Sequence, residues 1–185
     1  MRDFFFPRNC LHCEEPISGK EKYFCTACQE HLQLVKPSHR CPHCFRYANP
    51  CLYCRKNPSP WTRRAALFEA AGPGKSLQLS LGYPGVLELV ASLIVVQLEK
   101  LQWKEPNEIT YQPYSLFERI EKGPDLTPEL VKLLKKKLRP QKNSDPVILV
   151  ITTDNRQVQT EKLLHRFPKE LLRLDITTRH LNLTR

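Results

Sequence analysis

The hydrophobic pattern is clearest in the C-terminal two thirds of the chain, where helical and strand-like spacings both occur. Residues 86–101 carry apolar side chains three and four positions apart, as one face of a helix requires: Leu87, Val90, Ala91, Ile94 and Leu98. Residues 147–151 instead form an unbroken run of β-branched and apolar side chains, which is typical of a strand buried on both faces of a parallel sheet. Together these two segments predict an α/β domain.

Shorter patterns place further elements before and between these two. Residues 64–70 predict a strand, which the turn Gly72-Pro73-Gly74 ends, and residues 75–81 predict a short helix. Residues 108–112 predict another strand from a shorter pattern. The strands and helices therefore alternate, as expected for a sheet that is mostly parallel.

The last third of the chain is predicted to contain helix, strand, helix and strand in that order. Thr127 is a suitable N-cap with Pro128 at the first helical position, and Pro140 ends the helix that they begin. After the apolar strand, residues 156–166 predict a helix and residues 172–176 a strand with alternating side chains. The strand, helix and strand form a βαβ unit, which is right-handed and parallel in nearly all proteins.

Cysteines change this picture, because all eight lie in the first 54 residues and form four Cys-x-x-Cys pairs. A tetrahedral zinc ion needs four ligands, and one such turn directs two thiolates at a point about 2.3 Å away. Eight cysteines therefore predict two structural zinc ions, since four thiolates leave no open coordination position for catalysis. The predicted metal ligands are Cys10, Cys13, Cys25, Cys28, Cys41, Cys44, Cys51 and Cys54.

The pairing of the four turns has two solutions. Sequential pairing joins the first turn with the second and the third with the fourth, which gives two consecutive zinc ribbons. Crossed pairing joins the first with the third and the second with the fourth, as in RING-type modules. The short gaps of 11, 12 and 6 residues between successive pairs favour the sequential arrangement. His12 and His43 lie inside two of the turns, but eight cysteines leave no need for them as ligands.

The pattern of the first seven residues indicates a reducing compartment for these cysteines. Residues 1–7 have one basic residue and only three consecutive phenylalanines before a proline, a pattern unlike a signal peptide. Disulfide bonds are therefore not expected, and a cytoplasmic location is. The longest apolar stretch, residues 86–98, is shorter than the ~20 residues of a membrane span and contains polar positions, so no membrane insertion is predicted.

Domain boundaries follow from composition. Residues 1–56 form the predicted double zinc ribbon, residues 57–63 a linker with two prolines, and residues 64–185 the α/β domain. The chain has a formal charge of +10 and a pI near 9.3, which is compatible with nucleic-acid binding. Each four-thiolate zinc centre carries two negative charges, however, so bound metal lowers the charge of the N-terminal region.

The spacing of the cysteines resembles the N-terminal double zinc ribbon of the ComF family, competence-associated bacterial proteins. Phe5-Phe6-Pro7 before the first pair, Leu32 after the second and Pro42 within the third belong to the same resemblance. The segments Leu81–Tyr83 and Ile109–Pro113 follow the family's order of features in the second half. The resemblance implies a phosphoribosyltransferase-like α/β domain with a small, mostly parallel sheet.

This chain departs from the family in the loop that binds phosphoribosyl pyrophosphate. In the family, an acidic pair and a Thr-Thr-Gly turn follow the apolar strand. Here Val150 is followed by Ile151, Thr152 and Thr153, and Asp154 replaces the glycine. The resemblance thus carries only Thr152 and Thr153 over to phosphate binding. The domain is expected to be shortened and degenerate, without catalysis and without bound phosphoribosyl pyrophosphate or magnesium.

These observations predict a non-catalytic zinc-ribbon accessory protein of DNA uptake or DNA processing. Its expected partner is single-stranded DNA or a protein, such as a competence helicase or recombination mediator. Basic and aromatic residues alternate on the expected binding surface, as base stacking requires: Arg40, Arg46, Tyr47, Tyr53, Arg55, Lys56, Trp61, Arg63 and Arg64. An equally supported alternative is that the aromatic residues of this set pack between the two domains. Two alternatives remain: an active phosphoribosyltransferase, and an adaptor that binds only protein.

Overall fold

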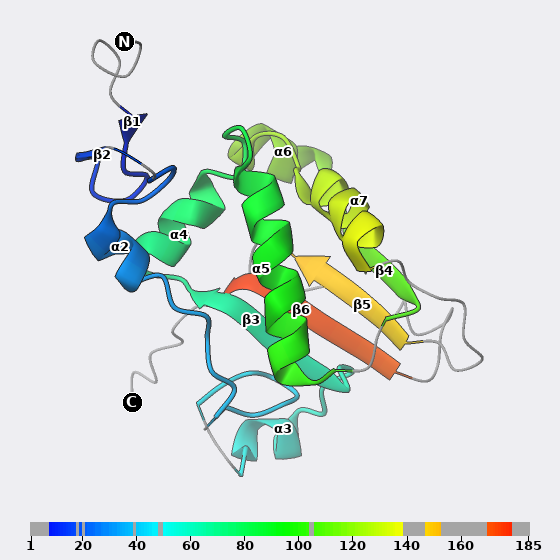
Figure 1. Cartoon of the computed structure of the whole chain (residues 1–185). Helices are drawn as coiled ribbons and strands as arrows, with labels where there is room; N and C mark the ends of the chain where they lie inside the picture. Colours follow the sequence, from blue (N-terminus) through cyan, green and yellow to red (C-terminus); the bar gives the residue numbers. More distant parts are fainter. Residues whose placement is uncertain are drawn as a thin grey trace.

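The centre of the molecule is a four-stranded parallel sheet (Figure 1). The computed structural model describes residues 8–17, 19, 21–38, 40–47, 50–103, 106–138, 147–152 and 170–178. The sheet has the order β3-β6-β5-β4, with β3 spanning Arg63–Glu69, β4 Glu108–Tyr111, β5 Val147–Thr152 and β6 Glu170–Thr178. All three pairings are parallel, so the predicted α/β class with a small parallel sheet is confirmed.

The side chains of the central strands explain why these segments form the sheet. All six residues of β5 are buried, as the unbroken apolar run predicted. Side chains at alternating positions of β6 enter the hydrophobic core, at Leu172, Leu174 and Ile176. Between them lie Arg173 and Asp175, which are buried but polar. Because successive strand residues point to opposite faces, the sheet has one apolar face and one face with buried charges.

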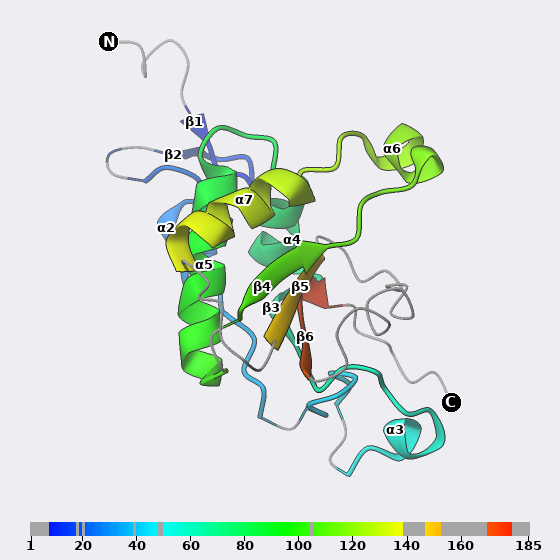
Figure 2. The same cartoon turned by 90° about the vertical axis from the view of Figure 1, so that its right-hand side faces the viewer.

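Two helices cover the apolar face (Figure 2). Helix α5 spans Val86–Leu101, as predicted, and packs against α7, which spans Thr127–Leu138. The buried side chains of α5 follow the predicted helical spacing and meet the sheet, with Val90 and Ile94 fully buried. The predicted helix at 156–166 lies outside the described residues.

Helix α4 corrects one predicted boundary. It spans Gly72–Leu79, so the three residues expected to form a turn are instead its first turn. Pro73 is compatible with this position because the first helical residues need no N–H donor. Gly74 is needed there for close packing, since a Cβ atom at this position would lie 2.6 Å from Phe68 Cβ. The Gly-Pro-Gly sequence therefore begins a helix that rests on the end of β3.

The segments with the cysteines lie at two separate places on the α/β unit (Figure 1). The first consists of β1 (Arg8–Asn9), β2 (Pro16–Ile17) and α2 (Thr26–Glu30), and it lies beside α4. The second contains α3 (Leu52–Lys56) and lies near the start of β3.

A connector between these two segments, residues 31–38, packs against the sheet. The Val35 N–H donates to the Leu67 carbonyl over 3.0 Å, and the buried Gln97 side chain donates to the Val35 carbonyl over 2.9 Å. Trp61, in the segment predicted as a linker, is also buried. The N-terminal segments and the α/β unit consequently share one hydrophobic core.

Helix α6, Leu116–Lys122, was not predicted from the sequence. Its seven residues show no long hydrophobic period, because none of its apolar side chains packs into the core. Ser115 forms a capping box with Glu118, in which each side chain accepts a hydrogen bond from the other residue's backbone N–H. Local hydrogen bonds rather than packing therefore stabilise this helix. No helix within the described ranges is long and apolar enough to cross a bilayer.

The close contact at Gly74 gives a direct test of this packing. Substitution Gly74→Ala is expected to destabilise the protein by about 1–3 kcal/mol, because the new methyl group would overlap Phe68 Cβ, which is fixed to the backbone of β3. Gly82→Ala is the matched control, since its Cβ would lie 3.8 Å from Leu126 Cδ1 in ordinary contact. Chemical denaturation measures the free energy of unfolding of both variants. Equal stability of the two would contradict the close approach of position 74 to Phe68.

Candidate metal centres

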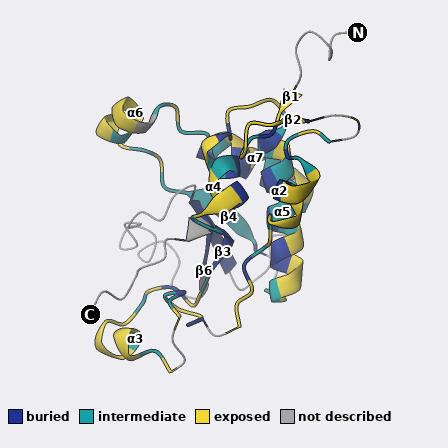
Figure 3. Ribbon diagram, turned by 90° about the vertical axis from the view of Figure 1, so that its left-hand side faces the viewer, coloured by how far each residue is buried: buried dark blue, intermediate teal, exposed yellow. Residues whose placement is uncertain are grey.

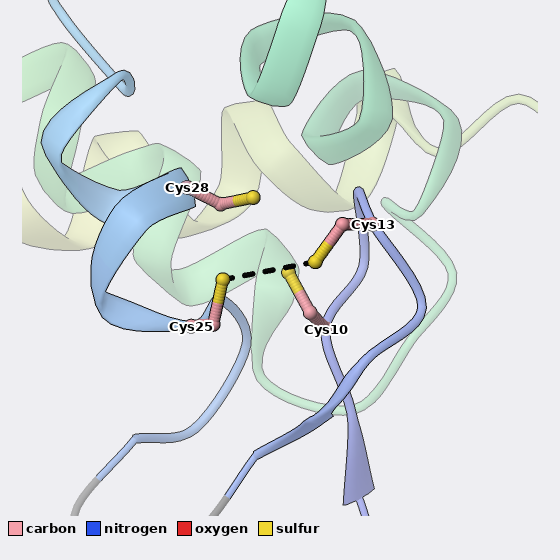
Figure 4. A group of neighbouring side chains, drawn as sticks. All are labelled: Cys10, Cys13, Cys25 and Cys28. Carbon is pink, nitrogen blue, oxygen red and sulfur yellow. Dashed lines mark hydrogen bonds between the residues drawn. The ribbon is translucent and has the colours of Figure 1, made fainter.

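The first cluster of sulfur atoms joins a turn to a short helix (Figure 4). Cys10 and Cys13 lie on the turn that follows β1, while Cys25 precedes α2 and Cys28 lies within it. The four Sγ atoms lie within 4.8 Å of one another, and those of Cys13 and Cys25 are 3.7 Å apart. Cys10 and Cys28 are buried, whereas Cys13 is exposed, so the cluster lies at the edge of the core.

The second cluster repeats this construction. Cys41 and Cys44 lie on a turn, Cys51 precedes α3 and Cys54 lies within it. Again all four Sγ atoms lie within 4.8 Å of one another, with 3.7 Å between Cys41 and Cys54 and 3.5 Å between Cys44 and Cys51. The two clusters thus combine the turns sequentially, which confirms the sequential pairing and excludes the crossed one.

The two turns have the same backbone geometry. In the first, the Cys10 N–H donates to the Glu15 carbonyl and the Glu14 N–H donates to the Cys10 carbonyl. In the second, Cys41, Phe45 and Arg46 make the equivalent two bonds. The fourth residue after each leading cysteine has a left-handed φ, 62° at Glu14 and 63° at Phe45. Such a conformation is costly for residues with a Cβ atom, so its occurrence in both turns indicates a shared requirement.

The spacing of the sulfur atoms fits zinc. A tetrahedral ion with Zn–S distances of about 2.3 Å places its ligands about 3.8 Å apart. The sulfur separations of 3.5–3.7 Å are close to that value and far from the ~2.05 Å of a disulfide bond. All eight cysteines are free thiols. Two clusters of four cysteines each therefore fit two structural zinc ions, as the sequence predicted.

The thiols within each cluster differ in their pKa values. Burial raises the pKa of the Cys10 thiol, but backbone N–H groups, first that of Cys13, outweigh it and lower this pKa to about 6. Burial together with the neighbouring thiols raises the pKa of Cys28. In the second cluster, the Cys54 N–H lowers the pKa of Cys51 to about 7, whereas burial raises that of Cys54. Each cluster ionises unevenly by itself, and a divalent cation would favour the thiolate form of all four ligands.

The two histidines in the turns contact residues outside the metal segments, on α4 and on the segment before β3. His12 Nδ1 lies 3.0 Å from Ser76 Oγ on α4, and His43 Nδ1 lies 3.2 Å from the Trp61 carbonyl. Tyr23 adds a hydrogen bond from its hydroxyl to the Pro84 carbonyl over 3.1 Å. His12 and His43 thus link the metal segments to distant parts of the chain. No sequence pattern around either histidine predicted these contacts.

Part of the predicted basic and aromatic surface lies together on the second metal segment. The Arg46 guanidinium stacks on the Tyr53 ring, with 3.6 Å from its Cζ atom to the ring centroid. Arg55 and Lys56 follow in the last turn of α3 and are exposed. Helix α3 is among the most exposed elements of the fold (Figure 3). These four residues form one accessible basic and aromatic surface, called the α3 surface below.

The remaining predicted members of that surface lie elsewhere or are covered. Arg40 is buried, donates to the Phe45 carbonyl, forms an ion pair with Glu69 and lies against the Tyr47 ring. Trp61 is also buried, with the Arg173 guanidinium near its ring. The prediction of an exposed position was therefore wrong for Arg40, whereas the buried Trp61 agrees with the alternative in which the aromatic residues pack between the domains. Arg63 and Tyr47 remain exposed.

Arg64 belongs to a buried charge cluster on the second face of the sheet. Its Nε atom donates to Asp175 Oδ2 over 2.8 Å, and Arg173 Nε donates to Asp175 Oδ1 over 2.8 Å. Thr152, completely buried, also donates its hydroxyl to Asp175. Thr152 therefore directs its O–H at a carboxylate, and Thr153, its predicted companion in phosphate binding, lies outside the described residues. No sequence pattern indicated this cluster, which the sheet assembles from three strands.

Comparison with protein-family models, curated proteins and solved structures finds no match for this chain. The assignment of function consequently depends on the geometry above.

The metal content tests the two centres separately. We expect two zinc equivalents in the purified protein, and one in each of the variants Cys28→Ser and Cys54→Ser, because each substitution removes a ligand from a different cluster. Elemental analysis after gel filtration gives the count. His12→Ala and His43→Ala are the controls and should retain two equivalents. Loss of both ions from a single cysteine variant would contradict independent sites.

Proposed function

We propose that this protein is a non-catalytic, zinc-stabilised accessory protein of DNA uptake or DNA processing, which binds single-stranded DNA through the α3 surface. The observation that carries the proposal is the stack of the half-buried Arg46 guanidinium on the exposed Tyr53 ring. Single-stranded nucleic acids bind where aromatic rings and guanidinium planes accept bases and cations accept the backbone. The α3 surface supplies both kinds of group.

The position of the zinc centre supports the same role. Cys51 and Cys54 bracket Tyr53 in sequence, so a metal ion held by their cluster fixes the helix that presents the ring. Helix α3 has five residues and no buried side chain, and a helix that short is not stable alone. Zinc binding would therefore hold α3 rigid, because the helix has too few hydrophobic contacts to do so. A preformed surface binds a flexible strand with a smaller entropic cost.

The absence of catalysis is supported by the sequence of the strand exit and by the contacts of Thr152. The resemblance to the ComF family implies a phosphoribosyltransferase-like domain, but this chain lacks the acidic pair and the glycine of the family's phosphoribosyl pyrophosphate loop. Thr152 donates its hydroxyl to Asp175 rather than presenting it to a ligand. The hydroxyl of Thr152 is therefore already engaged within the buried cluster of Arg64, Arg173 and Asp175.

Fluorescence anisotropy with a labelled single-stranded oligonucleotide of about 20 nucleotides tests the DNA-binding surface. Wild-type protein should bind, and the double variant Arg46→Ala/Arg55→Ala should bind at least about tenfold more weakly, because it loses one stacking plane and one phosphate contact. The double variant Lys132→Ala/Lys136→Ala is the matched control. It removes the same charge from exposed positions of α7.

Repeating the titration at two salt concentrations shows how many phosphate contacts each variant has lost. Each lost phosphate contact reduces the slope of log affinity against log salt by roughly 0.7 for a single strand. Equal weakening by the two double variants would show that only overall charge matters. No binding by the wild-type protein would contradict the proposal. It would favour an adaptor whose only partner is a protein, for example a helicase or a recombination mediator.

A separate measurement addresses the enzymatic alternative. Isothermal titration of the zinc-loaded protein with phosphoribosyl pyrophosphate and Mg²⁺ should give no binding heat, because the carboxylates that hold the ribose in the family are missing here. Saturable heat with one site per chain would contradict the non-catalytic assignment. An unrelated phosphoribosyltransferase that binds the ligand serves as the positive control.

A further inference from the structure

Helix α6 exposes three large apolar side chains. Leu116, Phe117 and Ile120 are 71%, 81% and 75% exposed. Ile120 follows the other two by four and three positions, the spacings at which residues are neighbours on a helix surface, so the three form one apolar face. The helix projects from the body of the molecule (Figure 2). Isolated apolar side chains on a surface are common, but three on one face of one projecting element indicate a contact surface.

Local hydrogen bonds stabilise α6, although its apolar face packs against no other element among the described residues. The capping box between Ser115 and Glu118 fixes its first turn. Asp125 then closes the base of the projecting segment, since its side chain accepts hydrogen bonds from the backbone N–H groups of Tyr114 and Thr127. Gly123, with φ of 83°, ends the helix. A preformed helix with an uncovered apolar face is suited to insertion into an apolar groove.

The chain itself contains such a groove. It has a volume of about 740 Å³ and lies between the connector and the C-terminal half of α5. Its apolar walls come from both sides, chiefly Leu32, Leu34, Leu93, Val96 and Leu101. Lys36 and Lys100 also line it, and both are exposed.

The groove matches α6 in length and charge. From Leu93 to Leu101 it follows α5 for about 12 Å at 1.5 Å per residue, and the seven residues of α6 span about 10 Å. Beside the apolar face of α6 lies Glu121, one turn after Phe117 and exposed, whereas the groove carries the two lysines. We propose that α6 of one molecule docks into this groove of a second copy, with Glu121 near Lys36 and Lys100.

A molecule does not fill its own groove, because α6 projects away from α5, which forms one wall of the groove (Figure 2). Helix α7 lies between α6 and α5 (Figure 2), and the groove is lined by α5 from Leu93 to its C-terminal end. The contact joins two different surfaces, so it is heterologous and repeats from copy to copy into a ring or an open chain. A helix of this size buries an area at the low end of specific interfaces, and the association is accordingly weak.

Sedimentation velocity of the full-length, zinc-loaded protein tests the contact. The average mass should rise with protein concentration towards about 1 mM. The double variant Phe117→Gln/Ile120→Gln and the groove variant Val96→Glu should each associate at least about tenfold more weakly, because apolar area leaves the interface or a charge enters it. Leu79→Gln is the control, since Leu79 is 75% exposed on α4, away from both surfaces. Circular dichroism confirms that each variant is folded.

Mixing the two defective variants gives the decisive result. The helix variant keeps an intact groove and the groove variant keeps an intact α6, so an equimolar mixture should form one-to-one dimers and nothing larger. In the wild-type protein, carbodiimide should cross-link Glu121 to Lys36 or Lys100 between molecules, which needs no substitution. A protein that stays monomeric throughout, a mixture that does not complement, or a control variant that dissociates equally would overturn the proposal.

Discussion

Tetrahedral coordination by four cysteines is the constraint on which the N-terminal third of this protein depends. Segments of some 20 residues bury too little apolar surface to fold by themselves, so a metal ion must replace most of a core. Both metal segments contain very little regular secondary structure. The strands β1 and β2 have two residues each, and α2 and α3 have five. The metal ions therefore define the local structure, including the two left-handed residues at Glu14 and Phe45.

The metal centres do not form an independent module, because each attaches to a different part of the α/β unit. The first is held at α4 and the loop before α5, through His12 and Tyr23. The second is held at β3 through Arg40 and at β6 through the contact of Trp61 with Arg173. The connector between them adds Val35 to the hydrophobic core. Two residues of the predicted basic and aromatic set thus stabilise the fold instead, and the proposed α3 surface is reduced to Arg46 and three exposed residues of α3.

The two faces of the sheet differ in polarity. Its helix-covered face is apolar, whereas the other face buries Asp175 between Arg64 and Arg173. Buried charges need partners, and three strands supply them because Arg64, Thr152 and Asp175 come from β3, β5 and β6. Substituting one member of such a cluster leaves charges unpaired in a low dielectric, so the cluster fixes which strands are neighbours.

The sequence by itself determined the zinc ligands, α5 and the buried strand β5, because each depends on a local pattern of spacing. Cysteines three residues apart direct two thiolates at one point, and apolar periodicity depends only on neighbouring residues. Tertiary structure alone decided which Cys-x-x-Cys turns combine, which arginines are buried, that Gly72-Pro73-Gly74 begins a helix, and that α6 projects with an apolar face. These features depend on atoms far apart in the chain, such as Arg40 and Glu69 or Gly74 and Phe68, whose proximity only the folded backbone creates.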